Sequence, residues 1–175
     1  AMMNLRLADP AMLIDIARIA ADQAAGRVRD LSQDIPKGLA PAREAMLVFL
    51  KEVEHKFGTD PRKTVLGGFS QGAMLSCDVM LRTTQPYAGL VQLSGTLLAT
   101  QEWIPLLQKR KGLPVFQSHG TQDELLPYVG GERLRDVLIK SGLTVEWHSF
   151  RGGHEIAESV LQRLGVFLMK VLMKP

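Results

Sequence analysis

The clearest indication of how this chain folds is the segment Thr64-Val65-Leu66-Gly67-Gly68-Phe69-Ser70-Gln71-Gly72. A short apolar run begins at Val65, and from Ala73 onward the apolar residues recur with helical spacing. The five residues from Gly68 are therefore a G-x-S-x-G between a predicted strand and a predicted helix. Such a turn exposes its serine hydroxyl above the sheet edge, and we expect both glycines to be required because side chains there would collide. The alternative is a glycine-rich structural turn, but the flanking strand and helix favour a nucleophile.

The rest of the chain alternates strands with helices. Downstream of residue 70 we expect strands at 88–94, 114–118 and 144–150, and helices at 71–82, 102–110, 131–141 and 155–172. Upstream we expect a strand at 3–7, a helix over 10–25, a loop over 27–38 with a helical turn near Leu31, and a helix over 41–57 that ends at Gly58. Phe57 is among the residues expected to face inward from that last helix. This alternation predicts right-handed crossovers and a mostly parallel sheet flanked by helices, which is an α/β fold.

Composition indicates one domain and excludes several classes of function. A chain of 175 residues, 46% apolar and 22% charged, can bury one core. The single cysteine, Cys77, excludes an internal disulfide framework and predicts a buried thiol in a cytoplasmic protein. No apolar run is long enough for a membrane span. The densest basic run, Lys109-Arg110-Lys111, ends a predicted helix and has no interleaved aromatic residues, so we expect no nucleic-acid partner.

A serine hydroxyl needs a base to take its proton, and that base needs an acid to orient it. In open α/β sheets the order along the chain is serine, then Asp or Glu, then His. Asp123 follows the strand at 114–118 and His154 follows the strand at 144–150, so both should reach the same sheet edge as Ser70. Glu124 is a competing carboxylate, but its helix-prone neighbours favour a solvent-facing position. Ser70, Asp123 and His154 are therefore the predicted catalytic residues.

The other histidines have structural interpretations. His55 is predicted on the polar side of a helix, and His148 is predicted to face a neighbouring layer from its strand. His119 directly follows a strand, where its imidazole could brace the Asp123 loop. No histidine, cysteine or acidic residue has the spacing of a metal site, so we expect neither a metal nor a cofactor.

Four blocks carry a resemblance to a known family: Gly67-Gly68-Phe69-Ser70-Gln71-Gly72-Ala73, Leu93-Ser94-Gly95, His119-Gly120-x-x-Asp123 and Gly153-His154-Glu155-Ile156. Together they resemble the phospholipase/carboxylesterase family of α/β-hydrolases, which includes the acyl-protein thioesterases. The likeness runs from about Ala42 to the C-terminus. It implies a carboxylesterase that hydrolyses short- to medium-chain carboxylic or thiol esters of small molecules, without a cofactor. It also implies that the backbone N–H of Gln71 is the first oxyanion donor.

The front of the chain departs from that family pattern. Family members have several strands before the nucleophile strand and an early His-Gly loop that supplies a second oxyanion donor. Here only residues 3–7 could form an upstream strand, and no His-Gly occurs before His119. We therefore expect one N-terminally truncated hydrolase domain over 1–175, with an atypical segment at 1–38. An uncovered strand at 64–69 would favour a homodimer or larger homo-oligomer. The alternative function is a weakly active or inactive relic that self-associates or binds a partner.

The segment from Ser94 to Pro114 has room for one helix but not for a lid domain, so we expect an open site. Apolar residues near the predicted strand ends are candidate walls for the acyl chain, although each could equally belong to the core. They are Leu97, Trp103, Leu125, Leu126 and Ile156.

Overall fold

The centre of the molecule is a parallel sheet with four strands. The computed structural model describes residues 31–173. The sheet order is β1-β2-β3-β4, formed by β1 (Val65–Phe69), β2 (Gly89–Leu93), β3 (Pro114–Gly120) and β4 (Thr144–Phe150). Strands that are consecutive in the chain are neighbours in the sheet, and every pair is parallel. The predicted α/β class and the parallel sheet are therefore confirmed.

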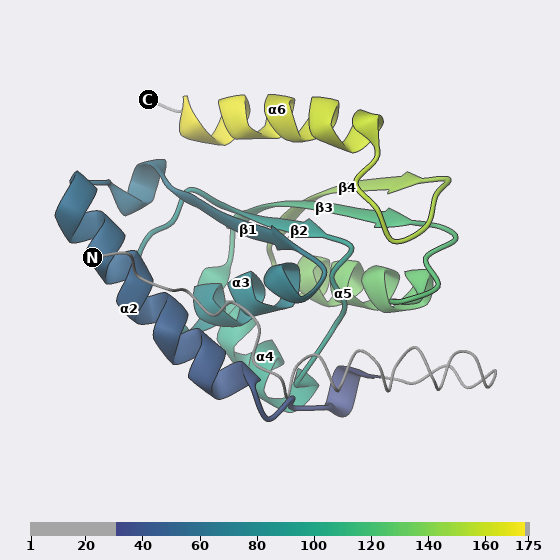
Figure 1. Cartoon of the computed structure of the whole chain (residues 1–175), viewed down its shortest axis with the longest axis horizontal. Helices are drawn as coiled ribbons and strands as arrows, with labels where there is room; N and C mark the ends of the chain where they lie inside the picture. The colour runs from purple at the N-terminus through teal and green to yellow at the C-terminus, as the bar shows by residue number, and fades with distance from the viewer. Residues whose placement is uncertain (1–30, 174–175) are drawn as a thin grey trace, which may run out of the picture.

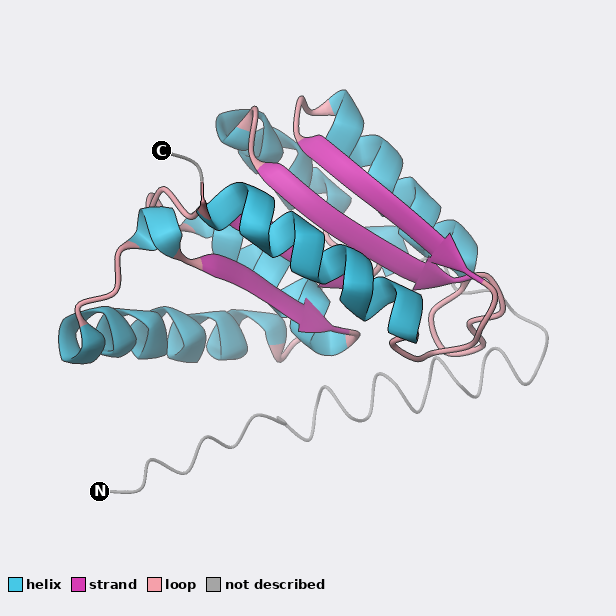
Figure 2. Ribbon diagram, turned by 90° about the horizontal axis from the view of Figure 1, so that it is seen from above, coloured by secondary structure: helices cyan, strands magenta, loops and turns pink. Residues whose placement is uncertain are grey.

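Helices cover the two faces of this sheet unequally. The chain order of the helices and 3₁₀ turns is η1 (Leu31–Gln33), α2 (Leu39–Phe57), η2 (Pro61–Lys63), α3 (Gln71–Arg82), α4 (Thr100–Leu107), η3 (Gln108–Arg110), α5 (Tyr128–Lys140) and α6 (Glu158–Leu172). Figure 1 shows α6 on one face of the sheet and α3, α4 and α5 on the other. Figure 2, seen from above, shows α6 lying over the sheet. On the opposite face α2 packs against α3 as an outer layer.

Alternate residues of the strands feed two cores, one on each face of the sheet. Leu90 and Val115 belong to the core beneath α3, α4 and α5, whereas Val91 and Phe116 face α6. Every residue of β2 is buried, as expected for a central strand of a parallel sheet. The α6 core is closed by Val160, Phe167 and Val171, and the rings of Phe116 and Phe167 lie 5.7 Å apart.

A buried carboxylate ties together three helices of the larger core. Asp78 on α3 is fully buried, and it accepts hydrogen bonds from Trp103 Nε1 at 2.9 Å and from Arg43 Nη1 at 2.9 Å. A third bond comes from Arg82 Nε at 3.2 Å. These donors offset the cost of burying the charge and connect α2, α3 and α4.

The observed elements differ from the predicted ones mainly at their ends. α4 spans Thr100–Leu107 and continues as the 3₁₀ turn η3, and α6 begins at Glu158 instead of residue 155. α5 begins at Tyr128, before the predicted start at 131, so Gly130 and Gly131 lie inside the helix. A Cβ at those positions would lie 2.3 Å from Thr96 Oγ1 and 2.4 Å from His119 Nδ1, so both glycines permit close packing of the helix.

The second half of α2 matches its prediction except for one side chain. The helix ends at Phe57, and Gly58 follows in the left-handed region at φ 62°. Phe57 was expected to face inward, but it is 68% exposed. The reason is that α2 packs on α3 along its earlier turns, where Met46 and Leu50 contact the core. The predicted helical turn near Leu31 is present as the 3₁₀ turn η1, whereas the strand predicted at 3–7 and the helix predicted over 10–25 lie outside the described residues.

Two further features set the surroundings of the site. Within residues 31–173, β1 pairs only with β2 and so forms one edge of the sheet. The connection from β2 to β3 contains α4 and η3 but no lid domain, as the sequence predicted.

Among the described helices, none has the length and the apolar character that a membrane span requires.

Candidate active site

Ser70 occupies a strained turn between β1 and α3. Its φ of 56° and ψ of −119° are rare for a residue with a side chain. The backbone N–H of Ser70 donates to Leu93 O at 2.8 Å, which fixes the turn to the end of β2. A Cβ at Gly68 would lie 2.3 Å from the carbonyl carbon of Gly72, whereas a Cβ at Gly72 itself would meet no atom of neighbouring elements within 4 Å. The expectation that both glycines avoid a collision is thus met at Gly68 and is wrong at Gly72.

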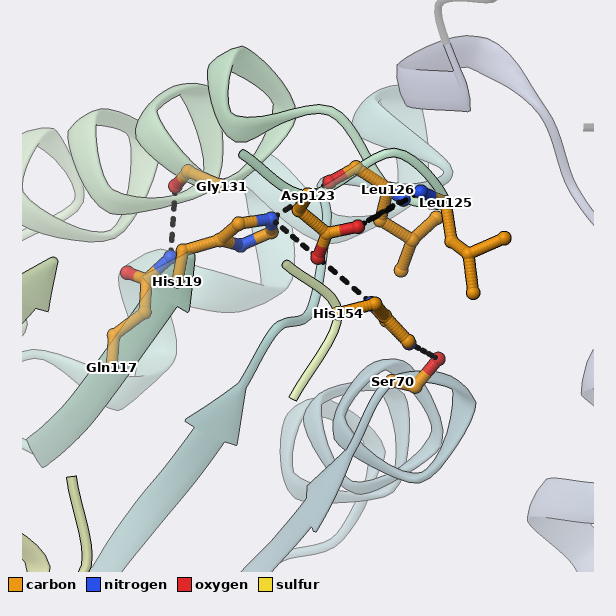
Figure 3. A network of polar contacts seen from close by, with 8 residues as sticks. All are labelled: Ser70, Gln117, His119, Asp123, Leu125, Leu126, Gly131 and His154. Atoms are coloured by element: carbon orange, nitrogen blue, oxygen red, sulfur yellow. Dashed lines mark hydrogen bonds and ion pairs between the residues drawn. The ribbon is translucent and has the colours of Figure 1, made fainter. Parts of the chain in front are cut away.

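The structure brings the three predicted catalytic side chains together in a hydrogen-bonded series. Ser70 Oγ lies 2.8 Å from His154 Nε2, and His154 Nδ1 lies 2.8 Å from Asp123 Oδ2 (Figure 3). The three residues follow β1, β3 and β4, whose carboxyl ends meet at one edge of the sheet. Glu124, the competing carboxylate, is exposed. In the neutral form His154 donates Nδ1–H to Asp123, which leaves Nε2 to accept the Ser70 proton.

Asp123 is held as a carboxylate despite its burial. Its side chain is shielded from solvent, and desolvation alone would raise the pKa. Hydrogen bonds from His119, from His154 and from the backbone N–H of Leu126 outweigh that effect and hold the pKa of Asp123 well below its usual range. Its other oxygen, Oδ1, accepts the N–H groups of Leu125 at 2.9 Å and Leu126 at 2.8 Å. The negative charge is therefore available to the imidazole of His154.

The loops that carry Asp123 and His154 are joined to each other by close backbone packing. Thr121 donates its N–H to Phe150 O at 2.9 Å, and Gln122 donates to Gly152 O at 2.9 Å. A Cβ at Gly120 would lie 2.2 Å from Gly153 O, so only glycine permits this approach. The ring of Phe69, directly before the serine, packs against the imidazole of His154 with centroids 4.7 Å apart.

The sequence interpretation did not assign roles to Gly120 or Phe69. Gly120 had an available signal, since a glycine directly after a predicted strand and before a candidate acid indicates a close backbone approach. Phe69 had none, because an aromatic residue at the end of a strand is equally typical of the core.

The other predicted site residues occupy different environments. Gln71 is the first residue of α3, so its backbone lies at the helix end that presents N–H groups beside Ser70. Leu125 and Ile156 are each 39% exposed near Asp123 and His154, whereas Leu97 and Leu126 are buried in the larger core. Trp103 is fully buried with its indole N–H on Asp78, so the structure does not bring it to the site surface.

In the described part of the chain, the other histidines and Cys77 do not form a second centre of this type. His55 is exposed on α2, and His148 Nε2 lies 3.1 Å from Ser159 Oγ on α6. Burial raises the pKa of the Cys77 thiol well above its ordinary value, which makes that residue unreactive. Residues 31–173 contain no cluster of His, Cys, Asp or Glu that could hold a metal ion.

Comparison with known proteins identifies similar chains. Residues 27–172 match the family model described as Phospholipase/Carboxylesterase. Acyl-protein thioesterase 1 of Candida albicans is 28% identical over 148 residues, which cover 81% of this chain and 64% of that protein. Acyl-protein thioesterase 1 of Gibberella zeae is 31% identical over 119 residues, covering 66% of this chain and 51% of that protein. The chain thus spans about half the length of several curated relatives that it matches.

Solved structures give the same result in three dimensions. Esterase PE8 superposes with a TM-score of 0.73 at 26% identity, covering 94% of this chain and 88% of the esterase. Arabidopsis thaliana SOBER1 superposes with a TM-score of 0.70 at 25% identity, covering 85% of this chain and 69% of that structure. The family predicted from the four sequence blocks is therefore confirmed.

Proposed function

Because the chain belongs to the phospholipase/carboxylesterase family, we propose that it is a serine hydrolase that cleaves short- to medium-chain carboxylic or thiol esters through an acyl-enzyme on Ser70. One observation carries the proposal. The hydroxyl of Ser70, on a backbone at φ 56°, is hydrogen-bonded at 2.8 Å to a histidine that is itself hydrogen-bonded to a buried carboxylate. That arrangement supplies a nucleophile, a base and an orienting acid in the order that acyl transfer requires.

The proposed reaction proceeds in two halves. His154 Nε2 takes the proton of Ser70 while Oγ attacks the ester carbonyl, and the same nitrogen then protonates the departing alcohol or thiol. A water molecule, deprotonated by His154, next attacks the acyl-serine carbonyl. His154 then returns that proton to Ser70 Oγ as the acyl–oxygen bond breaks and the carboxylic acid leaves. Asp123 stays ionised throughout and stabilises the imidazolium, in keeping with the lowered pKa of its carboxyl group.

The developing oxyanion needs donors that are in place before the reaction. We assign the backbone N–H of Gln71 as one donor, because this residue begins α3 directly after the nucleophile. The N-terminal end of α3 adds a partial positive charge on the same side.

The acyl group is proposed to lie against Leu125 and Ile156, which are partly exposed beside the acid and the base. Leu97 and Leu126 would support that surface from the core. The connection from β2 to β3 contains no lid domain, which favours short acyl chains on small-molecule esters. We propose a cytoplasmic location from the single buried thiol of Cys77.

Labelling with a fluorescent organophosphorus probe tests the nucleophile. The probe should modify Ser70 alone, and Ser70→Ala should abolish both labelling and hydrolysis of para-nitrophenyl butyrate. Ser159→Ala is the matched control, because Ser159 also contacts a histidine, His148, at 3.1 Å and should be dispensable. Labelling that persists in Ser70→Ala, or a loss of turnover in Ser159→Ala, would place the nucleophile elsewhere. Parallel assays with butyryl thioesters and with longer para-nitrophenyl esters would then define the leaving group and the acyl length.

Self-association is a second candidate function, and the sheet edge favours it. Within residues 31–173 β1 has one neighbour, and its sequence Val65–Phe69 contains no charge and no proline to discourage pairing. We propose that a second copy of the chain covers this edge. Light scattering on the mass-verified 175-residue chain should give a dimer or larger species, whereas a monomer at micromolar concentration would eliminate this candidate.

A further inference from the structure

Two hydrogen bonds and one longer contact link His119, Leu126 and Asp123 on the side of the proposed catalytic acid opposite His154. His119, at the end of β3, is fully buried, and its Nε2 lies 2.8 Å from Leu126 O and 3.3 Å from Asp123 Oδ2. Leu126 returns its own N–H to Asp123 Oδ1 at 2.8 Å. Figure 3 shows the imidazoles of His119 and His154 on different sides of the Asp123 carboxylate. His119 thus contacts Oδ2 of Asp123 directly and is linked to Oδ1 through Leu126.

The contacts of His119 determine its tautomer. A carbonyl oxygen only accepts hydrogen bonds, so Nε2 must carry the proton that points to Leu126 O and, at longer range, to Asp123 Oδ2. Nδ1 is then an acceptor, and among the described residues it has no hydrogen-bond partner. This ring is therefore a fixed donor toward the acid.

Helix α5 sets the position of the His119 ring. A Cβ at Gly131 would lie 2.4 Å from Nδ1, 2.9 Å from Cγ and 3.1 Å from Cε1, so the backbone of α5 is in direct contact with the imidazole. Tyr128, on the first turn of α5, meets the same ring edge to face with centroids 6.0 Å apart. In the described part of the chain, the titratable side chains that contact the His119 ring are Asp123 and Tyr128.

We propose that His119 is a positioning residue for the triad: its Nε2–H fixes the Asp123 carboxylate against His154, and Gly131 on α5 holds the His119 ring at the required depth. The inference rests on the proposed hydrolase function and deepens it. When His154 becomes an imidazolium, its partner carboxylate must not rotate, because a shift of about 1 Å in a reacting constellation can cost about 100-fold in rate.

Substitution of His119 tests the direct contact. His119→Leu removes the donor at similar volume and should lower kcat for para-nitrophenyl butyrate by about 10- to 100-fold with KM unchanged. His119→Gln places an amide N–H near the position of Nε2 and should recover most of that loss. The rising limb of kcat/KM should move to higher pH in His119→Leu but not in His119→Gln, because the lost N–H dipole opposed positive charge on His154. A lower fraction of folded enzyme would not move that limb.

Substitution of Gly131 tests the same positioning role from α5 without changing any hydrogen-bonding side chain, and it decides the question if His119→Leu fails to fold. Gly131→Ala should displace the imidazole and lower kcat about tenfold or more, with the pH limb shifted in the same direction. The matched control is Gly165→Ala on α6, where an added Cβ meets no atom within 4 Å, and it should keep wild-type kcat. Circular dichroism verifies folding of each variant.

The outcomes separate this inference from the proposed function. If wild type fails to react with the organophosphorus probe, the proposed function is wrong. If wild type reacts and folded Gly131→Ala or His119→Leu keeps its kcat and pH limb, His119 has no positioning role. Equal damage by His119→Gln and His119→Leu would also overturn the inference, because the donor would then not be the relevant property.

Discussion

Replacement of Asp123 by asparagine has an outcome that the surrounding hydrogen bonds determine. Oδ1 accepts two backbone N–H groups, from Leu125 and Leu126, so the amide oxygen of the asparagine must occupy that position. The amide NH₂ then takes the place of Oδ2 and points a proton at His154 Nδ1. His154 can accept that bond only as the tautomer that carries its proton on Nε2. In that tautomer it cannot take the proton of Ser70.

The size of the effect follows from loss of the base. An inverted tautomer in a Ser-His-Asp triad lowers kcat by about 10⁴-fold. At about 1.4 kcal/mol per factor of ten, this corresponds to about 5.5 kcal/mol of lost transition-state stabilisation. KM should change little, because the Asp123 side chain is buried and the proposed acyl contacts are Leu125 and Ile156. The side-chain volume is unchanged, so no cavity contributes.

Steady-state hydrolysis of para-nitrophenyl butyrate by Asp123→Asn, with active-site titration by the organophosphorus probe, measures this loss. Glu124→Gln is the control, since it makes the same chemical change at the adjacent exposed position and should keep wild-type kcat. The tautomer argument fails if Asp123→Asn stays within tenfold of wild type, and the acid is misassigned if Glu124→Gln carries the loss instead.

Two further predictions concern the turn and the charge of the acid. Gly68→Ala should destabilise the fold by roughly 1–3 kcal/mol and impair turnover, because its Cβ would meet backbone atoms of Gly72 and Ala73 at 2.3–2.8 Å. Gly72→Ala should be tolerated, because its Cβ would meet no atom of a neighbouring element. Urea unfolding of both variants measures the difference, and equal stabilities would contradict the prediction. The folded-state pKa of Asp123 is depressed, so its charge stabilises the fold above the unfolded pKa of about 3.9, and this contribution is lost as the pH falls toward the folded value. The free-energy difference between wild type and Asp123→Asn should therefore be constant above about pH 5 and should move in favour of the variant below about pH 4, and a difference independent of pH would refute the assignment.

Much of the fold was predictable because its local signals agree. Glycine and proline mark the ends of most elements, and the strands around Leu90 and Val115 are apolar enough to indicate a buried parallel sheet. The ends of α5 were less predictable. Gly130 and Gly131 indicate a break in a helix from sequence alone, whereas in the structure they permit contact with Thr96 and His119. In the sequence, a glycine required for close packing looks the same as a glycine required for a turn.

The grouping of the candidate site residues was predictable where those residues follow strand ends. The positions of side chains that depend on core packing were less predictable. Ser70, Asp123 and His154 each follow a strand, and the rule that parallel strands end at one edge was sufficient to group them. Trp103 looked like a pocket wall because it is large and apolar, but its indole N–H needs an acceptor, and Asp78 provides one inside the core. The contacts among His119, Leu126 and Asp123 depend on a tautomer and on side-chain directions that no sequence pattern encodes.

The proposed nucleophile and the proposed base lie far apart along the chain, so hydrolytic activity can report on the progress of folding. Ser70 and His154 are 84 positions apart, and three parallel crossovers must form before their side chains meet. A polypeptide that has ordered β1 and α3 but not yet docked β4 would possess the serine turn without any activating base. Covalent capture of Ser70 during refolding should therefore lag behind the appearance of helical circular dichroism, and the length of that lag would time the arrival of the last strand.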